Sequence, residues 1–383
     1  MRKRKLLATV WALLLVVAAC GGDSAEDVTT TSGGTETTAD GGVSTTSGGG
    51  SGVPTHDEIV AAAEQEPSGF IALATAGDLV GEDLAAMFNE KYPFAEAQVF
   101  DSGSGDAQTV QLELAAGRHE SDVVRLFEPQ WTEYTDFLLD LDLAELAEAG
   151  SLAIPVEMIE PEFGRAAYSA VFLGATTFNP ERVAEYGIDM TTVATWDDLL
   201  AACDEMGGGQ VTEDLGPEQF ATLGVAMGTD GLVEYAEAFQ ERCDPVFLDG
   251  NTARNTAVGA GEYAISATGN HHSAIEVQGE GGNLEIAFLD PIPGKAASMT
   301  GINATTERPN MSLLYMEFLF SPEVQALFDE KIPSGSLIIE ENAGHRNYEI
   351  VDGRETSIES WESLSSTPER VQLLQETWGF PSG

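Results

Sequence analysis

Two histidines stand side by side at His271 and His272, and they are the residues of this chain with the clearest potential for chemistry. The preceding residues 263–267 are apolar and partly β-branched, which predicts a buried strand, and Gly269 with Asn270 marks its end. Ligands of open α/β sheets bind outside the carboxyl ends of the strands, so both imidazoles are candidates for ligand contact. The alternative is that they are surface or capping residues.

Polar and small residues also follow the first two predicted strands, at 70–74 and 98–100. By the same topological argument, the residues after these strands should face a ligand cleft: Thr75, Ala76, Gly77, Ser102, Gly103 and Ser104. The Ser-Gly-Ser-Gly loop begins a predicted helix, so its backbone amides could hold an anionic group. Alternatively, Ser104 only caps that helix.

Two further candidates come from other strand ends. Glu128 could pair with a cation, although a glutamate before proline often simply begins a helix. Thr176 lies where the chain is expected to leave one half of the molecule, and its hydroxyl could donate to a ligand or belong to an ordinary strand.

The elements that would position these residues alternate along the chain. Strands are predicted at 70–74, 98–100 and 122–126 with helices between them, which indicates a parallel sheet covered by helices. A second set of strands and helices lies between 170 and 289, and apolar helices return after 311. More residues follow the N-terminal region than one hydrophobic core usually serves, so we expect two α/β lobes.

The N-terminus predicts export. Four basic residues at 2–5 precede the apolar run 6–19, which is too short for a comfortable membrane span. The sequence Val17-Ala18-Ala19-Cys20-Gly21 resembles the bacterial lipobox. The resemblance implies a lipoprotein signal peptide at 1–20, a lipidated Cys20 and anchoring to the outer face of the cytoplasmic membrane. The alternative is an ordinary secreted protein.

Residues 21–53 are mostly Thr, Ser, Gly, Asp and Glu, which predicts a disordered tether. The whole chain has 64 acidic and 17 basic residues, for a formal net charge of -47. Such a surface repels nucleic acid, so we expect no nucleic-acid partner. The excess of acid is typical of adaptation to salt, and the sharper alternative is a preference for cationic ligands.

The chain has three cysteines. If Cys20 carries lipid, Cys203 and Cys243 remain as an even pair in an oxidising compartment, and we expect a disulfide between them. Neither has the C-x-x-C spacing that would favour zinc or a redox centre.

The order of motifs between Phe70 and Phe328 resembles the extracellular solute-binding proteins of bacterial ABC importers. It is carried by the Ser-Gly-Ser-Gly loop, Ser121-Asp122-Val123-Val124, Phe178-Asn179-Pro180, Thr195-Trp196-Asp197-Asp198-Leu199, Gly261-Glu262 and Ser321-Pro322-Glu323-Val324-Gln325. The resemblance implies a two-lobed periplasmic-binding-protein-like fold (type II), with a ligand cleft between two α/β lobes joined by a hinge. Lobe 1 would comprise 54–175 and 294–383, and lobe 2 would comprise 176–293.

Within that family the chain is most similar to the ferric-iron-binding branch, whose second lobe carries Asn-Tyr-Tyr after a Gly-Glu strand. The matching residues are Asn270, His271 and His272, and Glu128 falls near the first-lobe glutamate of that branch. The histidine of the branch after the first strand has no counterpart at 75–77. Because imidazoles replace both tyrosines, a metal set of His271, His272 and Glu128 would suit zinc or another borderline divalent ion at least as well as iron.

The function implied by the resemblance is that of an extracellular, lipid-anchored, monomeric protein. It would capture a small solute such as a metal ion or its complex and deliver it to an ABC permease, without a resident cofactor and without catalysis. The alternatives are a two-lobed sensor lipoprotein without transport, or an organic solute such as a sugar, polyamine or phosphonate. An exported hydrolase is disfavoured, because G-x-S-x-G and H-E-x-x-H are both absent.

Overall fold

Short parallel strands and one long antiparallel strand build the first of two sheets. The computed structural model describes residues 52–102, 106–118, 120–126, 130–332 and 335–380. The predicted strands at 70–74, 98–100 and 122–126 are confirmed, and β1 pairs in parallel with its neighbours on both sides. The order is β11-β10-β3-β1-β2, with β4 also paired to β10. The strands are β1 (Ile71–Ala74), β2 (Gln98–Asp101), β3 (Val123–Arg125), β4 (Ala166–Leu173), β10 (Ile292–Ile302) and β11 (Thr356–Ile358).

Helices with apolar faces cover this first sheet, and we call the sheet with these helices the first lobe. Phe88 of α2 and Tyr315 of α11 pack edge to face, with ring centroids 5.2 Å apart. The helices are α1 (His56–Ala63), α2 (Gly77–Lys91), α3 (Ala107–Ala115), η2 (Gln130–Phe137), α4 (Leu143–Glu148), η3 (Val156–Met158), α11 (Pro309–Phe318), α12 (Pro322–Lys331), η5 (Glu340–Asn342), α13 (Arg346–Val351) and α14 (Trp361–Leu364).

The second sheet has the order β7-β6-β8-β5-β9, and it forms the second lobe with its own helices and hydrophobic core. Its strands are β5 (Thr176–Phe178), β6 (Val211–Asp214), β7 (Val246–Leu248), β8 (Ile265–Ser266) and β9 (Glu285–Ala287). Its helices are α5 (Pro180–Glu185), η4 (Met190–Thr192), α6 (Trp196–Met206), α7 (Glu218–Ala221), α8 (Gly224–Cys243), α9 (Asn251–Gly259) and α10 (His271–Gly279). The predicted strand before the paired histidines is thus confirmed as β8.

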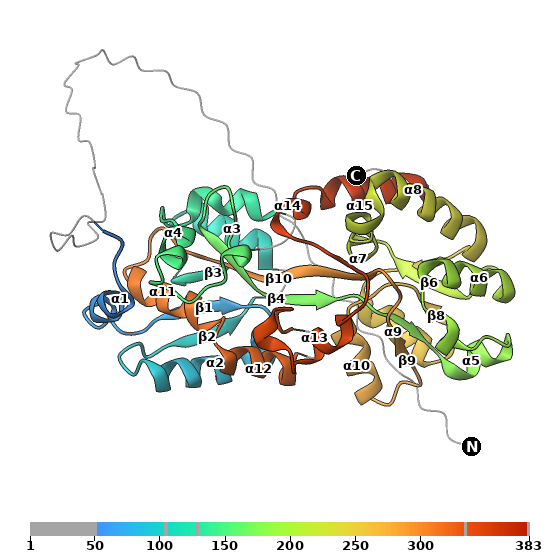
Figure 1. Ribbon diagram of the computed structural model, residues 1–383, viewed down its shortest axis with the longest axis horizontal. Coiled ribbons are helices and arrows are strands. Elements are labelled where there is room, and N and C mark those ends of the chain that lie inside the picture. The colour runs from blue at the N-terminus through green and yellow to red at the C-terminus, as the bar shows by residue number, and fades with distance from the viewer. Residues whose placement is uncertain (1–51, 103–105, 119, 127–129, 333–334, 381–383) are drawn as a thin grey trace, which may run out of the picture. The chain divides into compact units, whose positions relative to one another are not determined.

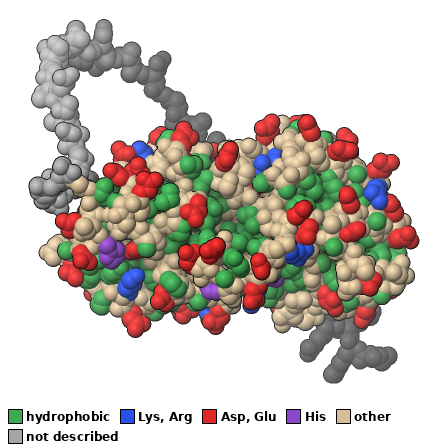
Figure 2. Space-filling model, viewed as in Figure 1, with side chains coloured by type: hydrophobic (Ala, Val, Ile, Leu, Met, Phe, Trp, Pro, Cys, Tyr) green, Lys and Arg blue, Asp and Glu red, His purple; other side chains and the backbone are tan. Residues whose placement is uncertain are grey.

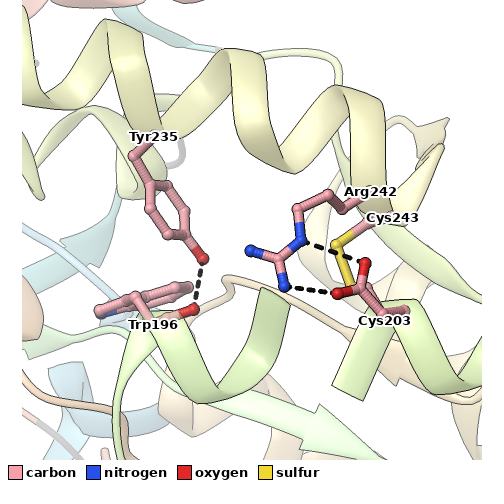
Figure 3. The surroundings of a disulfide bond; sticks show 6 residues. Trp196, Cys203, Tyr235, Arg242 and Cys243 are labelled. Atoms are coloured by element: carbon pink, nitrogen blue, oxygen red, sulfur yellow. Dashed lines mark hydrogen bonds and ion pairs between the residues drawn. A yellow bond between two sulfur atoms is a disulfide. The ribbon is translucent and has the colours of Figure 1, made fainter. Parts of the chain in front are cut away.

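The expected disulfide is present and joins α6 to α8. The sulfur atoms of Cys203 and Cys243 are bonded, and both side chains are fully buried. Figure 3 shows the bond beside a second link between the same helices, in which the Tyr235 hydroxyl donates to the Trp196 carbonyl oxygen at 2.9 Å. These two contacts hold the two helices together over much of their length.

The chain passes between the two sheets twice. It leaves the first sheet after β4 and enters the second at β5, then returns from β9 into β10. Figure 1 shows β4 and β10 side by side, and their antiparallel pairing extends to Gly294, opposite Leu173. Gly174 follows β4 at a point where a Cβ atom would lie 2.7 Å from Cγ of the rigid Pro293 ring, so a larger residue would force the crossing segments to shift.

The last helix differs from the expected lobe assignment. Residues 294–383 were expected in the first lobe, but α15 (Thr367–Thr377) packs against α7 and α8. Figure 1 shows it in red beside α8. Leu374 and Trp378 belong to the hydrophobic core of the second lobe, because α8 leaves an apolar face that they cover. The remaining lobe boundaries stay a proposal.

Figure 2 shows acidic side chains distributed over the whole visible face, with few Lys and Arg among them, as the net charge of -47 requires. Within the described part of the chain, no helix has the length and the apolar content to span a bilayer. The predicted signal peptide, Cys20 and the tether lie outside the described residues, apart from 52 and 53.

Candidate functional site

A pocket of about 240 Å³ lies at the carboxyl end of β1. Its walls come from both lobes, because the turn between β1 and α2 and strand β4 supply one side and α10 supplies the other. The lining residues are Thr75, Ala76, Asp78, Leu79, Phe172, His272, Glu276 and Ile332. A parallel strand followed directly by a helix is the position at which α/β proteins bind ligands.

A tight turn brings the end of β1 to the pocket. Ala76 has a left-handed backbone with φ of 54°, and α2 begins at the next residue. A Cβ atom on Gly77 would lie 2.5 Å from the Cα of Asp101, so glycine is required there. The Gly77 amide donates to Asp101 Oδ1 at 2.7 Å, which ties the turn to β2. The turn places Thr75 and Asp78 at the same pocket.

The other wall is one face of α10. His272 and Glu276 are four residues apart and therefore lie on the same side of the helix. The His272 ring packs against the Phe172 ring, with centroids 5.1 Å apart. Burial, followed by the charge of Lys295, lowers the pKa of His272 to about 4. The imidazole is therefore neutral at pH 7, and its Nδ1 is buried without a hydrogen-bond partner among the described residues.

The two adjacent histidines have different surroundings. His271 is 5% exposed and packs edge-on against Phe288, with ring centroids 5.0 Å apart. Burial, then the charges of Arg346 and His272, lower its pKa to about 4 as well. His271 is not among the residues that line the pocket. Only the second histidine of the pair therefore faces the pocket.

The pocket is acidic. Asp78 and Glu276 approach it from opposite walls, and both side chains are solvent-exposed. Burial is the largest cause that raises the pKa of Glu276, followed by the charge of Asp78 and then that of Glu280. The two pocket carboxylates therefore repel one another across the space between the lobes.

A buried ionic network holds the segment that precedes α10. Arg254 is 1% exposed, and its guanidinium donates to Glu213 Oε1 at 3.3 Å and to Asn251 Oδ1 at 2.8 Å. Glu213 accepts hydrogen bonds from the amide and the hydroxyl of Thr268, at 3.0 and 2.7 Å. Asn251 Oδ1 accepts from the Asn270 amide at 3.0 Å. The segment that leads from β8 to the histidines is thus held by charged groups inside the second lobe.

The structure brings only some of the predicted site residues together. Thr75, Ala76 and His272 line the pocket, while Gly77 forms the turn behind it. The Thr176 hydroxyl donates to the Ala267 carbonyl oxygen at 2.7 Å, inside the second sheet. Ser102 is 2% exposed, and neither it nor Asn270 is a lining residue. Gly103, Ser104 and Glu128 lie outside the described residues.

Five lining residues are not among the ligand contacts expected from the sequence: Asp78, Leu79, Phe172, Glu276 and Ile332. Asp78 and Leu79 immediately follow the predicted Thr-Ala-Gly segment, and Glu276 is one helical turn beyond His272, so spacing carried a signal for these three. Phe172 lies in a strand whose residues are all buried, and Ile332 follows α12. Nothing in their local sequence distinguishes these two from core residues.

That His271, His272 and Glu128 bind a metal ion together remains a prediction, because Glu128 is outside the described part of the chain. Among the residues that are described, no three His, Cys, Asp or Glu side chains are grouped so as to hold a metal ion.

Comparisons with known proteins agree with this architecture. The model of the family "Bacterial extracellular solute-binding protein" matches residues 61–326, and no curated protein matches the chain in sequence. The ferric binding protein from Campylobacter jejuni has a TM-score of 0.58 and 16% identity, over 81% of this chain and 99% of that chain. AfuA from Actinobacillus pleuropneumoniae, solved with fructose-6-phosphate, has a TM-score of 0.57 and 16% identity, over 80% of this chain and 96% of that chain.

The GacH receptor of Streptomyces glaucescens, solved unliganded and with acarbose, gives a TM-score of 0.60 and 16% identity, over 82% of this chain and 94% of that chain. These likenesses show the two-lobed periplasmic-binding-protein fold, and they include proteins for different ligands. Both the fold and the family expected from the sequence are confirmed. The chain is a member of the bacterial extracellular solute-binding proteins, a family that binds solutes and does not act on them as enzymes.

Proposed function

We propose that this chain is a lipid-anchored receptor that captures a small solute in the pocket between β1 and α10 and delivers it to an ABC permease. The observation that carries the proposal is the pocket itself, because residues from both lobes line it. A solute that contacts both walls binds the closed arrangement of the lobes better than an open one, so it shifts the population toward closure. A permease could then distinguish the loaded receptor by its shape.

The ligands of the similar proteins are small but chemically different, so they support a small solute for this chain without indicating its chemical class. The similar proteins are a ferric binding protein, one solved with fructose-6-phosphate and one solved with acarbose. The volume of about 240 Å³ is below the roughly 300–1,000 Å³ that holds drug-sized ligands, which favours a compact solute or one end of a longer one.

A substitution at Leu79 tests the pocket. Leu79 lines it and is 44% exposed, so Leu79→Trp should fill space there while leaving the fold intact. The full chain is screened by calorimetry against sugars, sugar phosphates, polyamines, phosphonates, zinc and ferric citrate. We expect one of these to bind the wild type, and Leu79→Trp to weaken its binding by about tenfold or more, equivalent to about 1.4 kcal/mol.

The matched control for Leu79→Trp is Leu112→Trp. Leu112 is 63% exposed on α3 and is not a lining residue, so the same change there should leave the affinity unaltered. Equal affinity of the wild type and Leu79→Trp for the bound solute would place binding elsewhere. Preferential binding of zinc or the ferric complex would favour the metal proposal, and Glu128→Gln would then be the variant that tests the ligand set.

The lipid anchor is tested by Cys20→Ser in cells of a bacterium that processes lipoproteins. We expect the wild type to incorporate labelled palmitate and to sediment with membranes, whereas the variant should do neither. Labelling that persists in the variant would show that another residue carries the lipid. If the wild type is secreted without lipid, the proposed anchor is wrong, whereas the proposed capture of a solute is unaffected.

A further inference from the structure

We propose that the pocket between β1 and α10 takes an organic ammonium cation, held by the carboxylates of Asp78 and Glu276 and by the ring of Phe172. This inference rests on the proposed solute-binding function and names the class of solute. Asp78 belongs to the first turn of α2, and Glu276 belongs to α10, so one carboxylate comes from each lobe.

The charge of the pocket favours a cation. Within the described residues, the lining includes two carboxylates and no Lys or Arg. Neither carboxylate has a side-chain hydrogen bond or an ion pair among the described residues. The nearby Lys295 forms an ion pair with Glu218 at 3.2 Å. A cation between Asp78 and Glu276 would replace their repulsion with two attractions and would favour closure of the lobes.

A buried polar group supplies an independent sign of a ligand. Thr75 lines the pocket at the end of β1 and is only 9% exposed, and its hydroxyl has no hydrogen-bond partner among the residues that the structure describes. Buried polar groups are normally paired, because an unpaired one loses its hydration without compensation. The Thr75 oxygen and the two carboxylates all have lone pairs that can accept hydrogen bonds. This excess of acceptors suits a ligand that donates N–H groups.

The aromatic wall distinguishes an organic cation from a bare metal ion. Phe172 is 8% exposed and lies against the His272 ring at the pocket. A phenyl face attracts an ammonium group electrostatically, and it also accommodates the methyl or methylene groups that such a ligand carries. The grouping of three carboxylate, imidazole or thiolate side chains that a metal site needs is absent from the described residues.

The simplest alternative is that the two carboxylates only stabilise their surroundings. Asp78 lies in the first turn of α2, where the helix dipole favours negative charge. That explanation does not extend to Glu276, which follows the middle of α10, or to the unpaired hydroxyl of Thr75. Charge, unpaired acceptors and an aromatic wall meet at one pocket, and an ammonium ligand accounts for all three.

The experiment compares cations with neutral molecules of the same shape, by calorimetry on the full chain. The pairs are ethanolamine with ethylene glycol, and putrescine with 1,4-butanediol, so that each cation donates N–H groups and its neutral partner does not. We expect at least one ammonium compound to bind about tenfold or more tightly than its neutral partner. Asp78→Asn and Glu276→Gln should each weaken that binding by about tenfold, because each removes one charge without changing the shape of the side chain.

The matched control is Glu90→Gln, an exposed carboxylate near the far end of α2, which should leave the affinity unchanged. The inference is overturned by equal binding of a neutral partner, by unchanged affinity in both pocket variants, or by failure of both ammonium compounds to bind at about 1 mM. If a sugar or a phosphorylated sugar binds in their place and is sensitive to Leu79→Trp, the solute-binding proposal stands and only the ligand class is wrong.

Discussion

Arg254→Met should lower the free energy of unfolding by about 3–5 kcal/mol. Arg254 is 1% exposed and pairs with Glu213 at 3.3 Å and with Asp214 at 2.9 Å. The substitution keeps a similar apolar stem but leaves Glu213, which has no exposed surface, without its cation. Burial already raises the pKa of Glu213 and the charge of Arg254 offsets part of that rise, so removal of the arginine leaves the carboxylate uncompensated.

The measurement is urea unfolding of the full chain, with Arg242→Met as the matched control. Arg242 pairs with Asp204 at 2.6 Å, but the two side chains are 35% and 53% exposed, so water and salt screen the pair and its loss should cost much less than that of Arg254. Adding Glu213→Gln to Arg254→Met should recover part of the stability, because the unpaired charge is gone. A loss within about 1 kcal/mol for Arg254→Met would show that water reaches Glu213.

The same network predicts an effect on the pocket. Glu213 and Asn251 hold the Thr268 and Asn270 amides, which precede α10. Arg254→Met should therefore weaken solute binding even at temperatures where the variant remains folded. Near-ultraviolet circular dichroism of the variant gives the folded fraction and separates this loss of affinity from unfolding.

Removal of the disulfide should produce the second large effect. Cys203 and Cys243 are separated by 40 residues, and a cross-link that closes a loop of this length restricts the unfolded chain by about 4 kcal/mol in the entropic account. Both cysteines are fully buried in the core of the second lobe. We therefore expect the double variant Cys203→Ala and Cys243→Ala to lose about 3–5 kcal/mol of unfolding free energy, measured by urea denaturation.

Reduction provides the control for the disulfide. Wild type unfolded in urea with dithiothreitol should approach the stability of the double alanine variant, whereas the variant itself should be insensitive to the reductant. Figure 3 shows the hydrogen bond from Tyr235 to Trp196, which remains in both proteins, as does the ion pair of Arg242 with Asp204 between the same helices. A variant as stable as oxidised wild type would mean that the unfolded chain is already restricted in this region.

Local patterns in the sequence predicted much of the fold. Strands β1, β2, β3 and β8 and the cysteine pair were all accessible, because short apolar runs, glycine placement and cysteine parity are short-range signals. The packing of α15 on the second lobe was not accessible. Its apolar residues could pack on either lobe, and only the apolar face of α8 in the folded chain determines where they are buried.

Some features of the candidate site could likewise be predicted from the sequence, and others depend on the fold. The sequence by itself determined the family, the position of the first turn at Thr75 and the presence of a histidine pair at the start of α10. Only the tertiary structure decided that His272 faces the pocket while His271 packs on Phe288, because neighbours on a helix point about 100° apart and the packing selects one of them. The tertiary structure also places Asp78 and Glu276, two carboxylates far apart in the chain, on opposite walls of the pocket.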